Sequence, residues 1–191
     1  MKAIYKILST ILICAILSAC TPNTPTRSRD EEEIAVYSAI FNEQKDKSDS
    51  YLSYTKTLLI NRETGFYDFE KDDLLTSFVF IQNSTYEDYL TANQQSSTLD
   101  FVFTEIGTYE YFDFPEPGDD YFEELQAIMD EYPMFTSVTT FSRVGFNEKM
   151  DEALVYVGYY CGALCGTGGI FKLVRRGETW IVRRKTWWIF S

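Results

Sequence analysis

The sequence predicts an α+β domain in which N-terminal helices pack on an antiparallel sheet that ends in a four-stranded C-terminal meander. Before Pro133, apolar residues recur three or four positions apart, which is helical spacing. After Thr136 apolar and polar residues alternate, which is typical of strands with one buried face. The chain is also rich in aromatic residues, at 17% with 14 Tyr and 15 Phe, and this composition favours a β-rich core over disorder.

The first 29 residues are predicted to lie outside this domain. Residues 1–6 form a short basic start, and residues 7–17 are apolar apart from Ser9 and Thr10, which is the layout of a signal peptide. This run is shorter than the roughly 20 residues that a membrane-spanning helix needs. We therefore expect a signal peptide over residues 1–19, a flexible tether over residues 20–29 and a single domain over residues 30–191.

The four residues Leu17-Ser18-Ala19-Cys20 resemble the lipobox of bacterial lipoproteins, which consists of an aliphatic residue, two small residues and a cysteine. In that family the cysteine thiol receives a diacylglycerol, and a peptidase cuts the chain before the cysteine. The resemblance implies that Cys20 is lipidated and anchors the domain to a membrane of the bacterial cell envelope, facing the periplasm or the exterior. Two or three acyl chains hold such an anchor durably. The alternative is an ordinary secretory signal in which Cys20 is incidental.

The first part of the domain is predicted to alternate between helices and strands. The acidic residues 30–33 precede apolar residues at helical spacing, so the sequence predicts a helix over residues 31–44. The further predicted elements are a strand over 51–61, a helix after Asp72 or Asp73, a helix starting at the capping box 84–87, strands over 101–103 and 109–112, and a helix over 120–132.

The C-terminal meander is predicted from four alternating segments that short turn-forming breaks separate. These segments are residues 137–146, 153–161, 169–175 and 179–190. In the last segment Trp180 and Trp188 fall on one face and Trp187 on the other, so both faces are partly apolar. We therefore expect this strand to be central in the sheet or covered.

The net charge of −12 is unevenly distributed along the chain. Residues 21–135 hold 25 acidic and 7 basic residues, whereas residues 136–191 hold 4 acidic and 8 basic residues. Because an acidic surface repels phosphate backbones, we expect no nucleic acid partner. The acids are either a solvated exterior or a docking face for a basic protein, a peptide or a cation. The candidate acidic binding face consists of Asp72, Asp73, Glu87, Asp88, Asp119, Asp120, Glu123 and Glu124.

The residue types for most catalytic mechanisms are missing. The chain contains no histidine, which excludes Ser-His and Cys-His catalysis and imidazole metal ligands. Paired carboxylates can perform glycoside hydrolysis or bind calcium. However, neighbouring acids are expected by chance among 29 acidic residues, and no calcium-loop spacing occurs. We therefore predict no catalytic residue, no metal site and no cofactor.

Cys161 and Cys165 flank a glycine-containing loop that is predicted to join two strands. In an exported protein such a pair favours a disulfide bond, because the compartment is oxidising. A metal site would need two further soft or imidazole ligands, and the spacing differs from the CxxC of redox proteins. The disulfide is the preferred interpretation, and the redox role stays open as an alternative.

A basic cluster surrounds the last predicted hairpin and consists of Arg175, Arg176, Arg183, Arg184 and Lys185. Its simplest role is to pair with the acidic helices of the same domain. The alternative is a site for an anion or for a polysaccharide phosphate.

Three segments near the C-terminus, residues 141–147, 153–157 and 161–166, resemble a recurrent pattern in uncharacterised exported bacterial proteins. This resemblance implies no activity. The sequence as a whole predicts a membrane-anchored envelope lipoprotein that acts as a non-enzymatic binding module, or as an inhibitory or immunity module, with an acidic face. The alternative is a carboxylate-dependent hydrolase that acts on cell-wall material.

Overall fold

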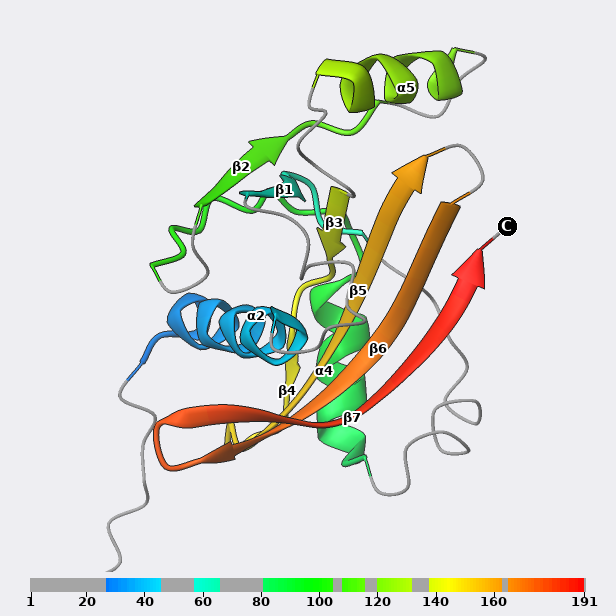
Figure 1. Cartoon of the computed structure of the whole chain (residues 1–191). Helices are drawn as coiled ribbons and strands as arrows, with labels where there is room; N and C mark the ends of the chain where they lie inside the picture. Colours follow the sequence, from blue (N-terminus) through cyan, green and yellow to red (C-terminus); the bar gives the residue numbers. More distant parts are fainter. Residues whose placement is uncertain are drawn as a thin grey trace, which may run out of the picture.

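The computed structural model describes residues 27–45, 57–65, 81–104, 108–115, 120–131, 138–162 and 165–190. These residues form three helices and a seven-stranded sheet, so the predicted α+β class is confirmed (Figure 1). The helices are α2 (Arg29–Lys45), α4 (Asn83–Ala92) and α5 (Tyr121–Glu131). The strands are β1 (Thr57–Asn61), β2 (Thr108–Phe112), β3 (Val138–Phe141), β4 (Gly145–Phe146), β5 (Glu152–Gly162), β6 (Cys165–Arg176) and β7 (Thr179–Phe190).

The sheet is mixed, so the prediction of an antiparallel sheet is wrong in its first half. The strand order is β2-β1-β3-β5-β6-β7, and β4 also pairs with β5. Strand β1 lies between β2 and β3 and runs parallel to both, with Leu59 opposite Glu110 on one side and Val138 on the other. Apolar alternation predicts which residues form a strand, but it carries no information on the direction of pairing.

The first predicted strand of the meander is divided into two. The backbone N–H of Ser142 donates to the carbonyl of Tyr156, and the N–H of Tyr156 donates to the hydroxyl of Ser142. This exchange interrupts the hydrogen-bond ladder along β5. Strands β3 and β4 therefore pair with β5 as two separate strands. The predicted strand over 101–103 is also absent from the ladder, because the N–H of Phe103 donates to the hydroxyl of Tyr109 instead.

Helix α4 begins without the predicted capping box. Its N-cap is Gln82, which makes no capping bond with its side chain. The carboxylate of Glu152 on β5 accepts hydrogen bonds from the backbone N–H of Gln82, at 2.7 Å, and from the hydroxyl of Thr85, at 2.9 Å. A tertiary carboxylate therefore replaces the local cap. The helix predicted after Asp72 or Asp73 lies outside the described residues.

Strand β7 lies at an edge of the described sheet rather than in its centre, and the alternative expectation of a covered strand holds for the face on which α2 packs. A β-bulge shifts its register, because Lys172 pairs with Arg184 whereas Leu173 pairs with Val182. The bulge reverses the alternation, so Trp187 shares the α2 face with Trp180 rather than standing opposite to it.

The helices cover both faces of the sheet. Helix α2 packs on the face that carries Val155, Phe171 and Trp180, and this is the main core. Helices α4 and α5 pack on the opposite face, where Tyr89 contacts the layer of Leu154 and Ile128 contacts the layer of Leu59 and Val138. Figure 1 shows α5 at one end of the sheet and the turn between β6 and β7 at the other.

Candidate functional site

A cleft with a volume of about 450 Å³ runs along the N-terminal half of α2. One wall is the helix, and the other is the start of β7 with the turn that precedes it. Its floor includes the apolar side chains of Ile34, Ala35 and Ala39, and its rim carries the carboxylates of Glu31 and Glu178. We call this feature the α2 cleft; its other lining residues are Arg27, Ser38, Asn42, Thr104, Thr179 and Trp180.

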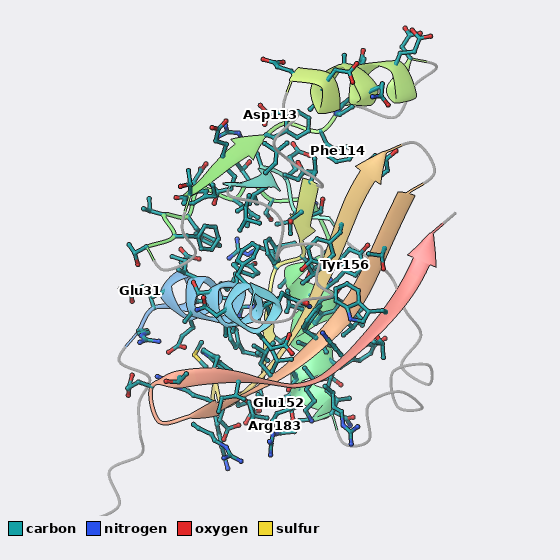
Figure 2. All side chains as sticks on the ribbon, viewed as in Figure 1. Glu31, Asp113, Phe114, Glu152, Tyr156 and Arg183 are labelled. Carbon is teal, nitrogen blue, oxygen red and sulfur yellow. The ribbon has the colours of Figure 1, made fainter. Side chains whose placement is uncertain are left out.

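Glu31 is held at the rim by a capping box at the start of α2. Its carboxylate accepts hydrogen bonds from the backbone N–H of Ser28, at 2.6 Å, and from the Ser28 hydroxyl, at 3.0 Å. The N–H of Glu31 donates back to that hydroxyl at 3.3 Å. The bond from the Ser28 N–H is the largest cause that lowers the pKa of Glu31, so its carboxylate is held in the ionised form. In Figure 2 Glu31 lies at the N-terminal end of α2.

The wall opposite the helix is fixed by Glu32, which is fully buried beneath the cleft. Its carboxylate accepts a hydrogen bond from the indole N–H of Trp180 at 2.7 Å and forms an ion pair with Arg175 at 2.9 Å. Both partners belong to the β6–β7 hairpin. This pairing fixes the hairpin against α2 and thereby places Glu178 at the rim. Arg27 connects the same parts, because its guanidinium donates to the carbonyl of Glu178 at 3.3 Å.

Glu33, the other fully buried acid of α2, is neutralised by two arginines. Arg143 approaches it at 2.8 Å and Arg29 at 3.3 Å, while the hydroxyl of Tyr37 donates to it at 3.1 Å. Burial and the nearby charge of Glu33 raise the pKa of Tyr37 well above its ordinary value. Burial lowers the pKa of Arg29, but the hydrogen bond and charge of Asp88, together with Glu33, outweigh this effect and raise it. This network is therefore structural, and its charges are satisfied within the domain.

The candidate acidic binding face is spread over two separate helices in the described residues. Glu87 and Asp88 lie on α4, whereas Glu123 and Glu124 are exposed on α5, preceded by Asp120. The carboxylate of Asp88 pairs with Arg29 at 2.9 Å and accepts the N–H of Phe146 at 2.7 Å, so it joins α4 to α2 and β4. The remaining members of the predicted face, Asp72, Asp73 and Asp119, lie outside the described residues.

The structure places the backbone of the two C-terminal cysteines in adjacent strands. Cys161 is near the end of β5 and Cys165 begins β6, with Gly162 opposite Cys165 in the ladder. Their side chains lie outside the described part of the structure, as does Cys20, so the disulfide and the lipidation stay predictions.

The basic cluster divides into paired and exposed members. Arg175 pairs with Glu32, and Lys185 forms an ion pair with Glu43 of α2 at 3.6 Å, so the predicted pairing with an acidic helix is confirmed for these two. The other three members, Arg176, Arg183 and Arg184, are exposed.

The chemistry of the α2 cleft is suited to binding rather than to bond cleavage. Two carboxylates above an apolar floor can hold a cationic side chain whose aliphatic stem lies on the floor. The sequence predicted the acids near Glu31 as partners of the helix dipole and missed the cleft, because residues 27–42, 104 and 178–180 converge only in the fold. The burial of Glu32 and Glu33 had a local signal, since they stand four positions before the core residues Val36 and Tyr37.

Comparisons with protein-family models, with curated proteins and with solved structures found no match for this chain. Within the described residues, no cluster of three or more Cys, Asp or Glu side chains is arranged to hold a metal ion. No helix in that part of the chain is both long and apolar enough to span a bilayer.

Proposed function

We propose that this protein is a bacterial envelope lipoprotein, anchored through acylated Cys20, whose domain is a non-enzymatic binding module. Its α2 cleft holds a basic segment of a partner protein or peptide. The anchor is supported by the match of Leu17-Ser18-Ala19-Cys20 to the lipobox pattern. The binding role is supported by the cleft, whose rim carboxylates and apolar floor complement a lysine or an arginine side chain.

The observation that carries the binding role is the contrast between buried and rim carboxylates. Glu32, Glu33 and Glu152 are buried, and each is paired with a base of the same domain. Glu31 accepts hydrogen bonds from Ser28, and Glu178 approaches Arg175 at 3.3 Å, but the carboxylate of Glu178 is 68% exposed. The rim charges therefore face solvent, where a cation that enters the cleft meets both of them.

The position of the cleft fits a partner at the membrane surface. Arg27 lines the cleft, and Cys20 stands seven residues before it in the chain. Seven extended residues span at most about 25 Å, so an acylated Cys20 would keep the cleft close to the headgroups. A domain that covers the basic part of an enzyme or a pore at that surface would be an inhibitory or immunity module.

A carboxylate-dependent hydrolase is the second candidate, because Glu31 and Glu178 line the same cleft. Such an enzyme needs one carboxyl group whose pKa is raised, so that it can donate a proton. The pKa of Glu31 is lowered instead, by the hydrogen bonds from Ser28. Binding is therefore the better supported function, and the absence of glycan or peptide release from purified cell wall is the expected result for the intact protein.

Site-specific photocrosslinking in intact cells tests the binding role. A photoreactive phenylalanine derivative replaces either Asn42, an exposed residue of the cleft, or Ala127, an exposed residue of α5. The expected result is a crosslinked partner at position 42 only, and Glu178→Lys should reduce its yield because the partner segment is basic. Equal crosslinking at both positions, or a yield that Glu178→Lys leaves unchanged, would contradict the proposed use of the cleft.

The anchor is tested separately by Cys20→Ser. We expect the wild-type chain to incorporate labelled palmitate and to sediment with membranes, and the variant to do neither. Cys161→Ser serves as the matched control, because it removes a thiol without touching the lipobox. Palmitate incorporation that survives Cys20→Ser would refute the assignment of the acylated residue.

A further inference from the structure

The outer face of the β6–β7 hairpin, which we define as the side turned away from α2, carries unused positive charge. Arg176, Arg183 and Arg184 are exposed, and in the described part of the molecule none of them forms an ion pair or a hydrogen bond through its side chain. The other two members of the basic cluster are paired with Glu32 and Glu43 of α2. Among the described residues, two of the five charges are thus paired with acids of α2, and the other three side chains are exposed to solvent.

The register of the hairpin places these charges around an exposed apolar side chain. Ile181 is opposite Val174, two positions from Arg176 along β6, and Arg184 follows on the same face because it pairs with Lys172. The bulge adds Arg183 as an extra residue between Val182 and Arg184, and this side chain is also exposed. Ile181 is 36% exposed, which makes it one of the few large apolar residues at the described surface.

Among the described residues, three acids lie in the turns at this end of the sheet. Glu178 in the turn pairs with Arg175, and Asp151 accepts a hydrogen bond from the side chain of Asn147 at 2.6 Å. Glu148 in the turn before β5 is followed by Lys149, whose charge offsets it. The β6–β7 hairpin itself holds six basic residues and one acidic residue, so it carries a net charge of +5, although the whole chain carries −12.

The same end of the molecule is where the chain enters the domain. The guanidinium of Arg27 reaches the carbonyl of Glu178 at the turn between β6 and β7. Cys20 stands seven residues earlier, so the backbone of Arg27 can lie at most about 25 Å from the backbone of Cys20. Figure 2 shows Arg183 at the end of the molecule opposite α5, on which Glu123 and Glu124 are exposed.

We propose that the outer face of the β6–β7 hairpin docks on anionic phospholipid headgroups of the membrane that carries the anchor. The proposal rests on the anchoring through Cys20 put forward above. Arg176, Arg183 and Arg184 contact headgroup phosphates, Ile181 enters the interfacial layer, and the acidic helix α5 points away from the bilayer. A lipid surface is the occupant because the three arginines are exposed on the outer face of the hairpin and none of them lines the α2 cleft. In this orientation the α2 cleft opens beside the membrane rather than into bulk solvent.

The experiment reconstitutes the lipidated full-length mature protein into phosphatidylcholine vesicles with or without phosphatidylglycerol. Some of the lipid carries a nitroxide on its headgroup, which quenches tryptophan fluorescence at short range. All three tryptophans of the chain lie in β7, so the quenching reports how close this strand is to the headgroups. We expect phosphatidylglycerol to increase the quenching of the wild-type protein.

Two variants with the same change in net charge distinguish docking through the hairpin arginines from an effect of the overall charge of the protein. R176Q/R183Q/R184Q removes three positive charges from the hairpin, and Q94E/Q95E/A127E adds three negative charges at exposed positions on and near α4 and α5. Each basic residue near an anionic surface contributes about a fivefold effect, so the arginine variant should lower the ratio of docked to undocked protein on the order of a hundredfold. The glutamate variant should keep most of the quenching.

The possible results distinguish a failure of hairpin docking from a failure of the anchoring through Cys20. Protein that floats with the vesicles but shows no increase with phosphatidylglycerol, or an arginine variant quenched as strongly as the wild type, overturns hairpin docking and leaves the anchor intact. Equal loss in both variants also overturns it, because bulk charge then explains the effect. Wild-type protein that floats with neither vesicle overturns the anchoring, and hairpin docking falls with it.

Discussion

Removal of Arg175 is expected to destabilise the domain far more than loss of an ordinary surface ion pair. Its partner Glu32 is fully buried, and the side chain of Arg175 itself is only 12% exposed. In Arg175→Leu the carboxylate of Glu32 keeps its bond from Trp180 but loses its only basic partner in the described structure. Stranding a buried charge costs about 3–5 kcal/mol, whereas exposed ion pairs contribute about 0–1 kcal/mol. We therefore expect Arg175→Leu to lower the free energy of unfolding by about 3–5 kcal/mol.

The double variant Glu32→Leu/Arg175→Leu tests this reasoning, because it removes both charges. Only the indole N–H of Trp180 then lacks its partner, at a cost of about 1–3 kcal/mol, and the added apolar packing offsets part of that cost. Urea unfolding of the Cys20→Ser chain, followed by tryptophan fluorescence, measures both free energies of unfolding. The reasoning is refuted if the double variant is as unstable as Arg175→Leu, or if Arg175→Leu loses less than about 1 kcal/mol.

Three further predictions follow from buried contacts. The pKa of Tyr37 is raised by burial, so its stabilising contribution is present below pH about 10 and is lost as the pH rises above it; Tyr37→Phe should flatten this alkaline loss in urea titrations. Lys172→Met should cost about 3–5 kcal/mol in the free energy of unfolding, because the ammonium lies 2.7 Å from the buried Glu152. Gly145→Ala should lower the melting temperature in a thermal scan, since a Cβ there collides with the backbone of Tyr89 on α4, and overpacking of this kind costs about 1–3 kcal/mol.

Each of these predictions has a second residue against which it is compared. Burial and the nearby Tyr109 raise the pKa of Tyr111 to about 12. The Tyr37→Phe variant should therefore still lose part of its stability at alkaline pH, through Tyr111. Lys149→Met is the matched control for Lys172→Met, because Lys149 is exposed, and Gly177→Asn is the control for Gly145→Ala, because nothing lies near a Cβ at Gly177. An alkaline slope identical in wild type and Tyr37→Phe would contradict the first prediction. If Lys172→Met or Gly145→Ala lost no more stability than its control variant, the corresponding prediction would be contradicted.

The sequence predicts the local elements well, because their signals are local. The apolar positions of α2 and the acidic turn before them predict a helix over 31–44, and the structure has Arg29–Lys45. The alternation and the turn at Gly177 predict β6 and β7, and Gly177 adopts a positive φ of 61° in that turn. The parallel pairing of β1 with β2 and β3 depends on long connections and has no local signal.

The candidate site is harder to predict for a related reason. The bulge in β7 needs one extra residue, Arg183, that looks like any other position in an alternating pattern, yet it decides which tryptophan faces α2. Two acids at the start of α2 look like dipole partners, and although their spacing from Val36 and Tyr37 hints at burial, the partners of Glu32 are the distant Arg175 and Trp180. Charge counts along the chain detect the basic residues of the last hairpin, but not which of them pair with acids of α2.

The contact of α2 with the last hairpin also determines when the fold can be completed. A chain leaves a ribosome or a translocation channel with its N-terminus first, so α2 emerges long before β6 and β7. The partners of Glu32 stand 143 and 148 residues later in the sequence, at Arg175 and Trp180. Until they arrive, the emerged helix keeps a carboxylate at the N-terminal end of its apolar stripe, which discourages premature collapse onto earlier strands. Completion of the core is thus delayed until nearly the whole chain is outside, and a nascent lipoprotein would spend that interval attached to the membrane but unfolded.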